Sequence, residues 1–168
     1  MFKGRFLPKP SCDLFHLLAV VFLLAICLLL PTARAQEPYA VLSTDIVVFR
    51  DGVVHVTQTF GLNETLVSVS VILLSSSVGN VLVLDEANMP LSYEITPPIL
   101  TITTLGASKV TVDYLTSTLT QKEGEVWTLK VNTPYGATIT LPDKSIIIYF
   151  NDLPKSITAR GNKTVLVV

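Results

Sequence analysis

Residues 41–60 read VLSTDIVVFRDGVVHVTQTF and place two β-prone runs, Val41–Arg50 and Val53–Phe60, on either side of Asp51-Gly52. An Asp-Gly pair tolerates the positive φ angles of a two-residue type I′ turn, so the stretch predicts a β-hairpin. With that turn, the core face carries two facing apolar pairs, Val47 with Val56 and Phe49 with Val54. The opposite face carries Thr44, His55, Thr57 and Thr59, together with Ile46 and Val48.

The sequence from residue 36 onward has the same β-forming composition throughout. Of its 133 residues, 47 are Val, Ile or Thr and only 5 are Ala. Branched side chains lose rotamer freedom in a helix but pack well on a pleated sheet. No window carries a sustained apolar stripe with the 3.6-residue period of a helix. The predicted fold class is therefore all-β.

Further strands are predicted where apolar runs alternate with turn residues. In the first half these are Leu66–Leu73, Val81–Leu84 as a central strand, and Leu91–Thr96. In the second half they are Ile99–Leu105 and Lys109–Leu115 as a hairpin, Glu125–Val131 with Trp127 in the core, Ala137–Leu141, Ser145–Phe150 and Lys163–Val168. Strands at this spacing favour an antiparallel β-sandwich over residues 36–168, Ig-like in the broad sense. Pro97-Pro98 blocks ladder hydrogen bonds, so it marks either a crossover or the boundary between two small β-lobes near residues 97–98.

The first 35 residues have the three parts of a secretory signal peptide: a basic start, an apolar run over Leu14–Leu30 and the small-residue site Ala33-Arg34-Ala35. We predict a signal helix that is cleaved between Ala35 and Gln36. The alternative is an uncleaved anchor, because this 17-residue run reaches the lower limit of a spanning helix. The predicted location is therefore the outside of the cell or the outer face of the envelope, with membrane contact only through this segment if it is retained.

Removal of the leader changes what the rest of the chain can do. Residues 36–168 hold 8 Lys and Arg against 12 Asp and Glu, a net charge of −4, which gives no basic surface for nucleic acid. Both cysteines, Cys12 and Cys27, lie in the leader, so the remaining chain has no disulfide and no thiolate nucleophile or ligand. We predict no cofactor.

The one histidine beyond the leader, His55, is predicted to point outward from its strand as a structural residue. A Ser-His-Asp site needs a partner carboxylate and an activated serine, and no serine lies in a G-x-S-x-G elbow. One histidine without cysteine does not supply a usual zinc site. We therefore predict no catalytic residue and no metal site here.

Two sets of acidic residues offer alternatives to a domain without a metal or catalytic site. Asp85, Glu86 and Asn88 in one loop, and Asn151 and Asp152 in another, could bind calcium, but neither loop has the D-x-D-x-D-G spacing. Glu123 and Glu125 beside Trp127 could serve glycoside hydrolysis or sugar binding, although a solvated turn explains both carboxylates. Asn63-Glu64-Thr65 and Asn162-Lys163-Thr164 are candidate N-glycosylation sites, with Asn63 and Asn162 as acceptors.

The last third of the chain contains the stretches VTVDYLT at 110–116, GEVWTL at 124–129 and ITLP at 139–142. Together these stretches resemble the exported β-domains of uncharacterised archaeal envelope proteins, in which a sandwich ectodomain often precedes a membrane helix. The resemblance implies a cell-surface role and no functional residue. The present sequence differs in that it ends at Val168 without a C-terminal transmembrane segment.

These observations predict a non-catalytic, secreted or envelope-associated β-domain that acts by binding or surface assembly with a protein or envelope component. The alternatives are an extracellular hydrolase or carbohydrate-binding module, and a ligand-sensing ectodomain fragment of a membrane protein. Self-association is expected to use the apolar strand Lys163–Val168 if that strand lies at a sheet edge. If the strand pairs on both sides within its own sandwich, that route is closed.

Overall fold

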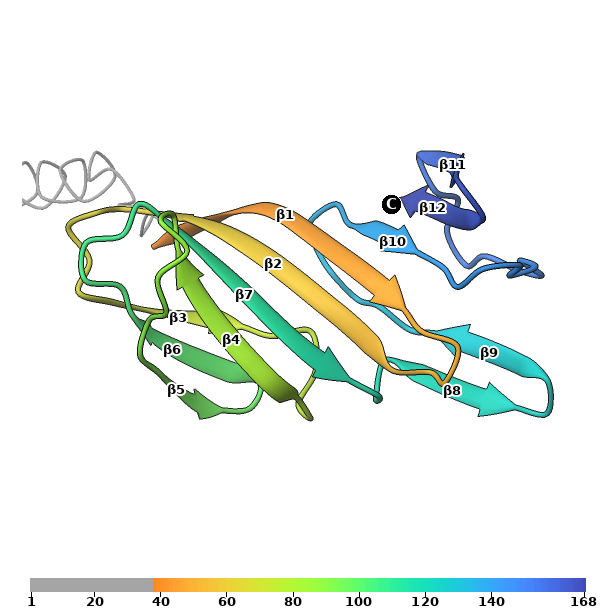
Figure 1. Cartoon of the computed structure of the whole chain (residues 1–168), viewed down its shortest axis with the longest axis horizontal. Coiled ribbons are helices and arrows are strands. Elements are labelled where there is room, and N and C mark those ends of the chain that lie inside the picture. The colour runs from red at the N-terminus through yellow and green to blue at the C-terminus, as the bar shows by residue number, and fades with distance from the viewer. Residues whose placement is uncertain (1–37) are drawn as a thin grey trace, which may run out of the picture. The chain divides into compact units, whose positions relative to one another are not determined.

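The computed structural model describes residues 38–168, which form twelve β-strands (Figure 1). The predicted signal helix and its cleavage site at Ala35 and Gln36 lie outside the described residues. The strands in chain order are β1 (Tyr39–Val48), β2 (Val54–Leu62), β3 (Ser68–Ile72), β4 (Gly79–Asp85), β5 (Tyr93–Thr96), β6 (Ile99–Thr103), β7 (Lys109–Thr116), β8 (Thr120–Glu123), β9 (Val126–Leu129), β10 (Thr138–Thr140), β11 (Ser156–Arg160) and β12 (Lys163–Val167). None of the described residues belongs to a helix long and apolar enough to span a bilayer.

The strands form a sandwich, which confirms the predicted all-β class. A seven-stranded sheet has the order β11-β12-β10-β1-β2-β7-β4, and a three-stranded sheet has the order β3-β6-β5. The strands β8 and β9 pair with each other as a separate hairpin. Figure 1 shows the three-stranded sheet beside β2, β7 and β4, and the buried core takes side chains from both sheets. Its fully buried members include Val54, Val56, Phe60, Val112 and Tyr114 from the larger sheet, and Val71, Leu100 and Ile102 from the smaller one.

The β1–β2 hairpin forms as predicted, but its register differs by one residue. The loop has three residues, Arg50-Asp51-Gly52: Phe49 N–H donates to Val53 O at 2.8 Å, and Gly52 N–H donates to Phe49 O at 3.1 Å. Gly52 has a φ of 86°, the left-handed residue that completes a type I turn with a bulge. Ile46 therefore faces Val56, and Val47 faces His55.

A one-residue slip in register turns every side chain of one strand to the other face. The predicted core face is correct for β2, where Val54 and Val56 are buried, and wrong for β1. There Thr44 and Ile46 are buried, whereas Phe49 is exposed and Val47 is only half-buried. The outward orientation of His55, Thr57 and Thr59 is as predicted.

Several other pairings also differ from the predictions. The strand β4 is an edge strand and not a central one. The strands β6 and β7 belong to different sheets, so they do not form the predicted hairpin. Pro97-Pro98, joined by a cis peptide bond, is the tight turn of the β5–β6 hairpin, in which Thr96 faces Ile99, and so it is not a crossover. Ser145–Phe150 forms no strand at all.

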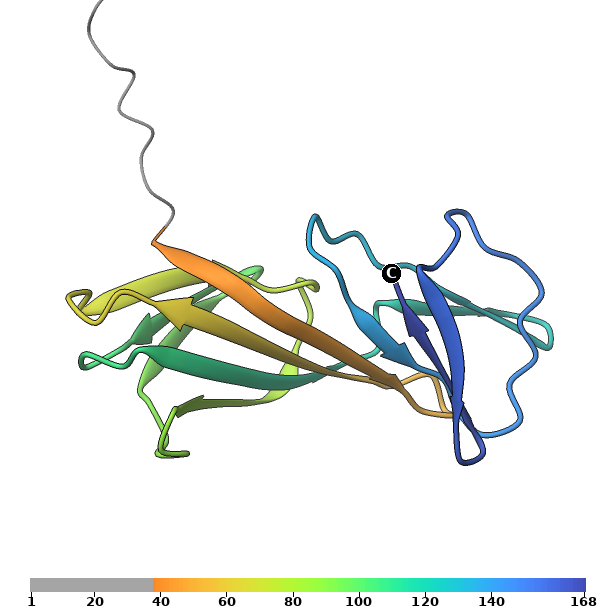
Figure 2. The same cartoon turned by 90° about the horizontal axis from the view of Figure 1, so that it is seen from above.

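The C-terminal strand lies inside its sheet. The strand β12 has β11 on one side and β10 on the other, so of the two alternatives for Lys163–Val168 the structure has the one in which the strand pairs on both sides within its own sandwich. The strand β10 continues the sheet by pairing with β1 in parallel, with Asp45 opposite Thr138. Figure 2 shows β10, β11 and β12 gathered at the carboxyl end of β1. The edges of the large sheet are therefore β11 and β4.

Candidate functional site

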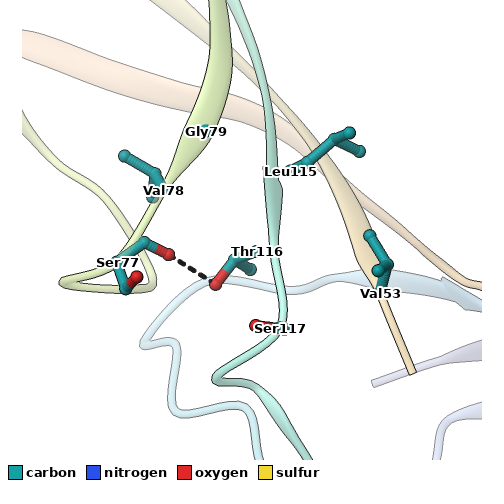
Figure 3. Close-up of a pocket in the computed structure, with 7 residues that line it drawn as sticks. All are labelled: Val53, Ser77, Val78, Gly79, Leu115, Thr116 and Ser117. Atoms are coloured by element: carbon teal, nitrogen blue, oxygen red, sulfur yellow. Dashed lines mark hydrogen bonds between the residues drawn. The ribbon is translucent and has the colours of Figure 1, made fainter. Parts of the chain in front are cut away.

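A pocket of about 380 Å³ lies where β2 and β4 begin and β7 ends (Figure 3). Its lining residues are Val53, Ser77, Val78, Gly79, Leu115, Thr116 and Ser117. None of these side chains ionises near neutral pH, so the lining offers no general acid or base. The pocket wall is fixed by Thr116, whose hydroxyl donates a 2.7 Å hydrogen bond to the backbone oxygen of Ser77.

A cluster of hydroxyl groups is connected to this pocket through Thr116. Ser75 and Thr116 are buried, and the Thr116 hydroxyl is 2.9 Å from Ser75 Oγ and 3.1 Å from Thr118 Oγ1. Ser75 and Thr118 are joined by a hydrogen bond of 2.6 Å. A hydroxyl becomes a strong nucleophile only beside a base, and these hydroxyls contact one another and backbone groups instead. The cluster therefore joins the end of β7 to the segment between β3 and β4, and sequence reasoning missed it although Ser75-Ser76-Ser77 was a visible signal.

His55 has a carboxylate partner that the sequence did not reveal. Its Nε2 lies 3.0 Å from Asp113 Oδ1 on the outer face of the large sheet, and the Thr57 hydroxyl donates to the same oxygen at 2.5 Å. The β2–β7 register, with Thr57 opposite Asp113, brings these groups together. Within residues 38–168 no hydroxyl is hydrogen-bonded to the imidazole, so the pair lacks the nucleophile of a catalytic triad.

Trp127 is not the core residue that its strand pattern predicted. Its side chain is 41% exposed, and its strand β9 pairs only with β8, outside the two larger sheets. Lys122, directly opposite on β8, places its Nζ 5.3 Å from the centroid of the Trp127 ring. The far edge of the ring lies against Gly52 in the β1–β2 turn. The ring therefore has the lysine and the turn as its neighbours.

The acidic residues singled out in the sequence lie at strand ends and in the turns and loops that follow them. Glu123 accepts a hydrogen bond of 3.0 Å from the Gln121 amide, and Glu125 is exposed in the β8–β9 turn. Asp85 Oδ1 accepts backbone hydrogen bonds of 2.8 Å from both Ala87 and Met89, which closes the loop after β4 as an Asx turn. Across the described part of the chain, no three acidic, histidine or cysteine side chains gather as a metal site.

The largest unexplained feature of the surface is an apolar segment between β10 and β11. We call residues 145–153 the apolar segment. Ile147 and Phe150 pack against the core, whereas Ile146, Ile148, Tyr149 and Leu153 are exposed. No backbone hydrogen bond joins residues 146–153 to any other described residue.

We expect Gly52→Ala to lower the free energy of unfolding by about 1–2 kcal/mol, because a residue with a Cβ is strained at the positive φ of this turn. The added Cβ also meets the Trp127 ring, which must move. Urea unfolding of Gly52→Ala, Trp127→Ala and the double variant separates the two causes. The double variant should lose less stability than the two single variants together. Strict additivity would show that Trp127 does not pack on the turn.

No protein-family model matches the chain, and no curated protein matches it. Solved structures that are similar include the M1 zinc metallopeptidase from Deinococcus radiodurans, with 16% identity and a TM-score of 0.45. A mutant of that enzyme matches with 16% identity and a TM-score of 0.46. The mutant bound to a Tyr-Ser-Ala substrate matches with 17% identity and a TM-score of 0.45. Each match covers 79% of this chain and 39% of the other, so the chain spans about two-fifths of their length. Values of this size carry no statement about activity.

Proposed function

We propose that this chain is a non-catalytic β-domain, exported to the cell surface or envelope, that acts by binding another polypeptide through the apolar segment. The observation that carries the proposal is the exposure of Ile146, Ile148, Tyr149 and Leu153 within one short stretch. Soluble monomers rarely leave large apolar side chains together in water, and such groups usually mark a binding surface. The signal-peptide pattern of residues 1–35 supports export.

The backbone of the same segment supports binding by strand addition. Ser145 N–H bonds to Pro142 O at 3.3 Å, and the next backbone donor along the chain is Lys155, which bonds to Val167 O at 2.7 Å. Between them the N–H and C=O groups have no backbone partner in the described chain. An incoming strand would satisfy these groups and cover the isoleucine side chains at the same time. The neighbouring strand β11, exposed along its length, extends this surface.

The central test is Ile148→Lys, at a side chain that is 75% exposed. Burying an isoleucine contributes about 1.5–3 kcal/mol, so the variant should bind its partner roughly ten- to a hundredfold more weakly. Its thermal stability should hardly change, because three-quarters of the side chain is already exposed to water. A photo-crosslinking residue placed at position 148 of the protein on its native envelope identifies the partner, whether a second copy or another protein.

Val67 provides the matched control, because it is 74% exposed and lies before β3, outside the apolar segment. Val67→Lys should leave binding unchanged, and a crosslinker at position 67 should give no adduct. Equal adducts at both positions, or none at either, would show that the apolar segment is not a binding surface. Concentration-dependent sedimentation of both variants distinguishes self-association from binding to another protein.

A further inference from the structure

The two glycosylation sequons are held in different conformations. In the loop between β2 and β3, the Asn63 side-chain oxygen accepts hydrogen bonds from the Thr65 N–H at 3.1 Å and from the Thr65 hydroxyl at 2.9 Å. Leu66 N–H donates to Asn63 O at 3.0 Å and closes the turn. Because a backbone N–H can only donate, the accepting atom is Oδ1. Asn63 is an exposed residue, and its Nδ2 has no hydrogen-bond partner among residues 38–168.

This arrangement prepares the amide nitrogen for reaction. When Nδ2 gives up a proton, negative charge develops on Oδ1, and two donors already point at that oxygen. Hydrogen bonds to the charged form stabilise it, as donors do in an oxyanion hole. The turn thus lowers the free energy of the species that attacks a sugar.

The second sequon lacks this geometry. Asn162 lies in the two-residue turn that joins β11 to β12, and Thr164 already belongs to β12, opposite Ala159. The backbone oxygen of Thr164 accepts a hydrogen bond of 2.9 Å from Leu141 N–H. No hydrogen bond joins the Asn162 and Thr164 side chains in the described structure. Folding Thr164 back toward Asn162 would pull β12 out of the sheet, where Val165 and Leu166 are buried.

We infer that Asn63 is an N-glycosylation site of the folded protein and that Asn162 is not. The donor is an oligosaccharide linked through a diphosphate to a polyisoprenyl lipid. A bond forms between Asn63 Nδ2 and the anomeric carbon, and the bond from that carbon to the diphosphate oxygen breaks with its electron pair. The amide proton passes to the base of the transferase, so no oxidant or reductant is required. The inference rests on the export part of the proposed function, since such donors are used outside the cytoplasm.

The test uses the full chain, purified in mild detergent from a host without N-glycosylation. It is incubated with a single-subunit oligosaccharyltransferase and a lipid-linked oligosaccharide, and glycopeptides are quantified by mass spectrometry. Asn63 should be modified about tenfold faster than Asn162, or more, a ratio that corresponds to about 1.4 kcal/mol in activation free energy. Because the protein is supplied already purified, the result does not depend on export or on the apolar segment.

Peptides spanning residues 58–70 and 157–168 provide the matched control, since they carry both sequons without the fold. Both peptides should be modified at similar rates. That result would show that the difference in modification rate between Asn63 and Asn162 arises from the folded structure. Asn63→Gln should leave the folded protein unmodified, and Asn162→Gln should leave the modification of Asn63 unchanged. An unmodified Asn63 in the folded chain, or equal modification of Asn162, overturns the inference.

Discussion

Replacing Ile46 with alanine is expected to lower the free energy of unfolding by about 2–5 kcal/mol. The side chain is fully buried between the sheets, opposite Val56 and beside the parallel strand β10, where Ile139 faces it. Truncation removes buried methyl groups and leaves a cavity that a densely packed sandwich fills only in part. Urea unfolding of the two proteins measures the loss.

Val47→Ala is the matched control, because Val47 is the next residue of β1 and points to the other face, opposite His55. That side chain is half-buried, so its truncation should cost only about 1 kcal/mol, the typical loss for a point substitution. A larger loss of unfolding free energy for Val47→Ala than for Ile46→Ala would instead support the two-residue turn and the register that it implies. The pair of variants therefore tests the hairpin register without another structure.

The second large effect is expected from Tyr114→Phe. The Tyr114 hydroxyl is buried between the sheets, where it donates to Gln58 Oε1 at 3.1 Å and accepts from Leu74 N–H at 3.0 Å. Without it, the buried amide oxygen of Gln58 and the part-buried N–H of Leu74 lose their partner, and leaving a buried group unpaired costs about 1–3 kcal/mol. We expect a loss of about 2–4 kcal/mol at neutral pH, although the volume of the core hardly changes.

The same hydroxyl gives the stability a pH dependence. Burial raises the pKa of Tyr114 from 10.0 to about 12, against a smaller lowering by the hydrogen bond from Leu74. Below about pH 10 the phenol is protonated in both states, and its contribution is constant. Between about pH 10 and 12 the unfolded chain loses the proton first, so unfolding becomes easier by about 2–3 kcal/mol. The Tyr114→Phe variant should lack this decline, and parallel urea titrations of both proteins would show a constant difference if the phenol were not buried.

The all-β class was predictable because it depends on residue composition and on the alternation of apolar and polar residues. Both signals are local to the sequence of each strand. The hairpin register was not, since Asp51-Gly52 suits both a two-residue turn and a three-residue turn with a left-handed Gly52. Only the packing decides between them. A core with Ile46 and Thr44 inside buries a larger aliphatic chain than Val47, at the cost of a Thr44 hydroxyl that has no hydrogen-bond partner.

Long-range pairing explains the remaining differences. Ser145–Phe150 has strong strand propensity, but propensity supplies no partner strand, and none of the described strands pairs with this segment. Trp127 has strand alternation, but alternation does not reveal that β9 pairs with β8 alone. The Asp113 partner of His55 depends on the β2–β7 register, which links residues from separate parts of the sequence. The sequons, by contrast, were visible as motifs, and only the backbone around them distinguishes Asn63 from Asn162.

The parallel pairing of β1 with β10 also has a consequence for the time course of folding. The first edge of β1 meets β2 directly after the turn, a local contact that closes fast. The other edge of β1 can pair only after β10 has formed, because Asp45 pairs with Thr138, a residue far away in the sequence. Since synthesis delivers the amino end first, β1 stays open on that side until the last strands emerge. The arrival of β10, and not the formation of the hairpin, therefore ends the period in which the second edge of β1 can mispair with a neighbouring molecule.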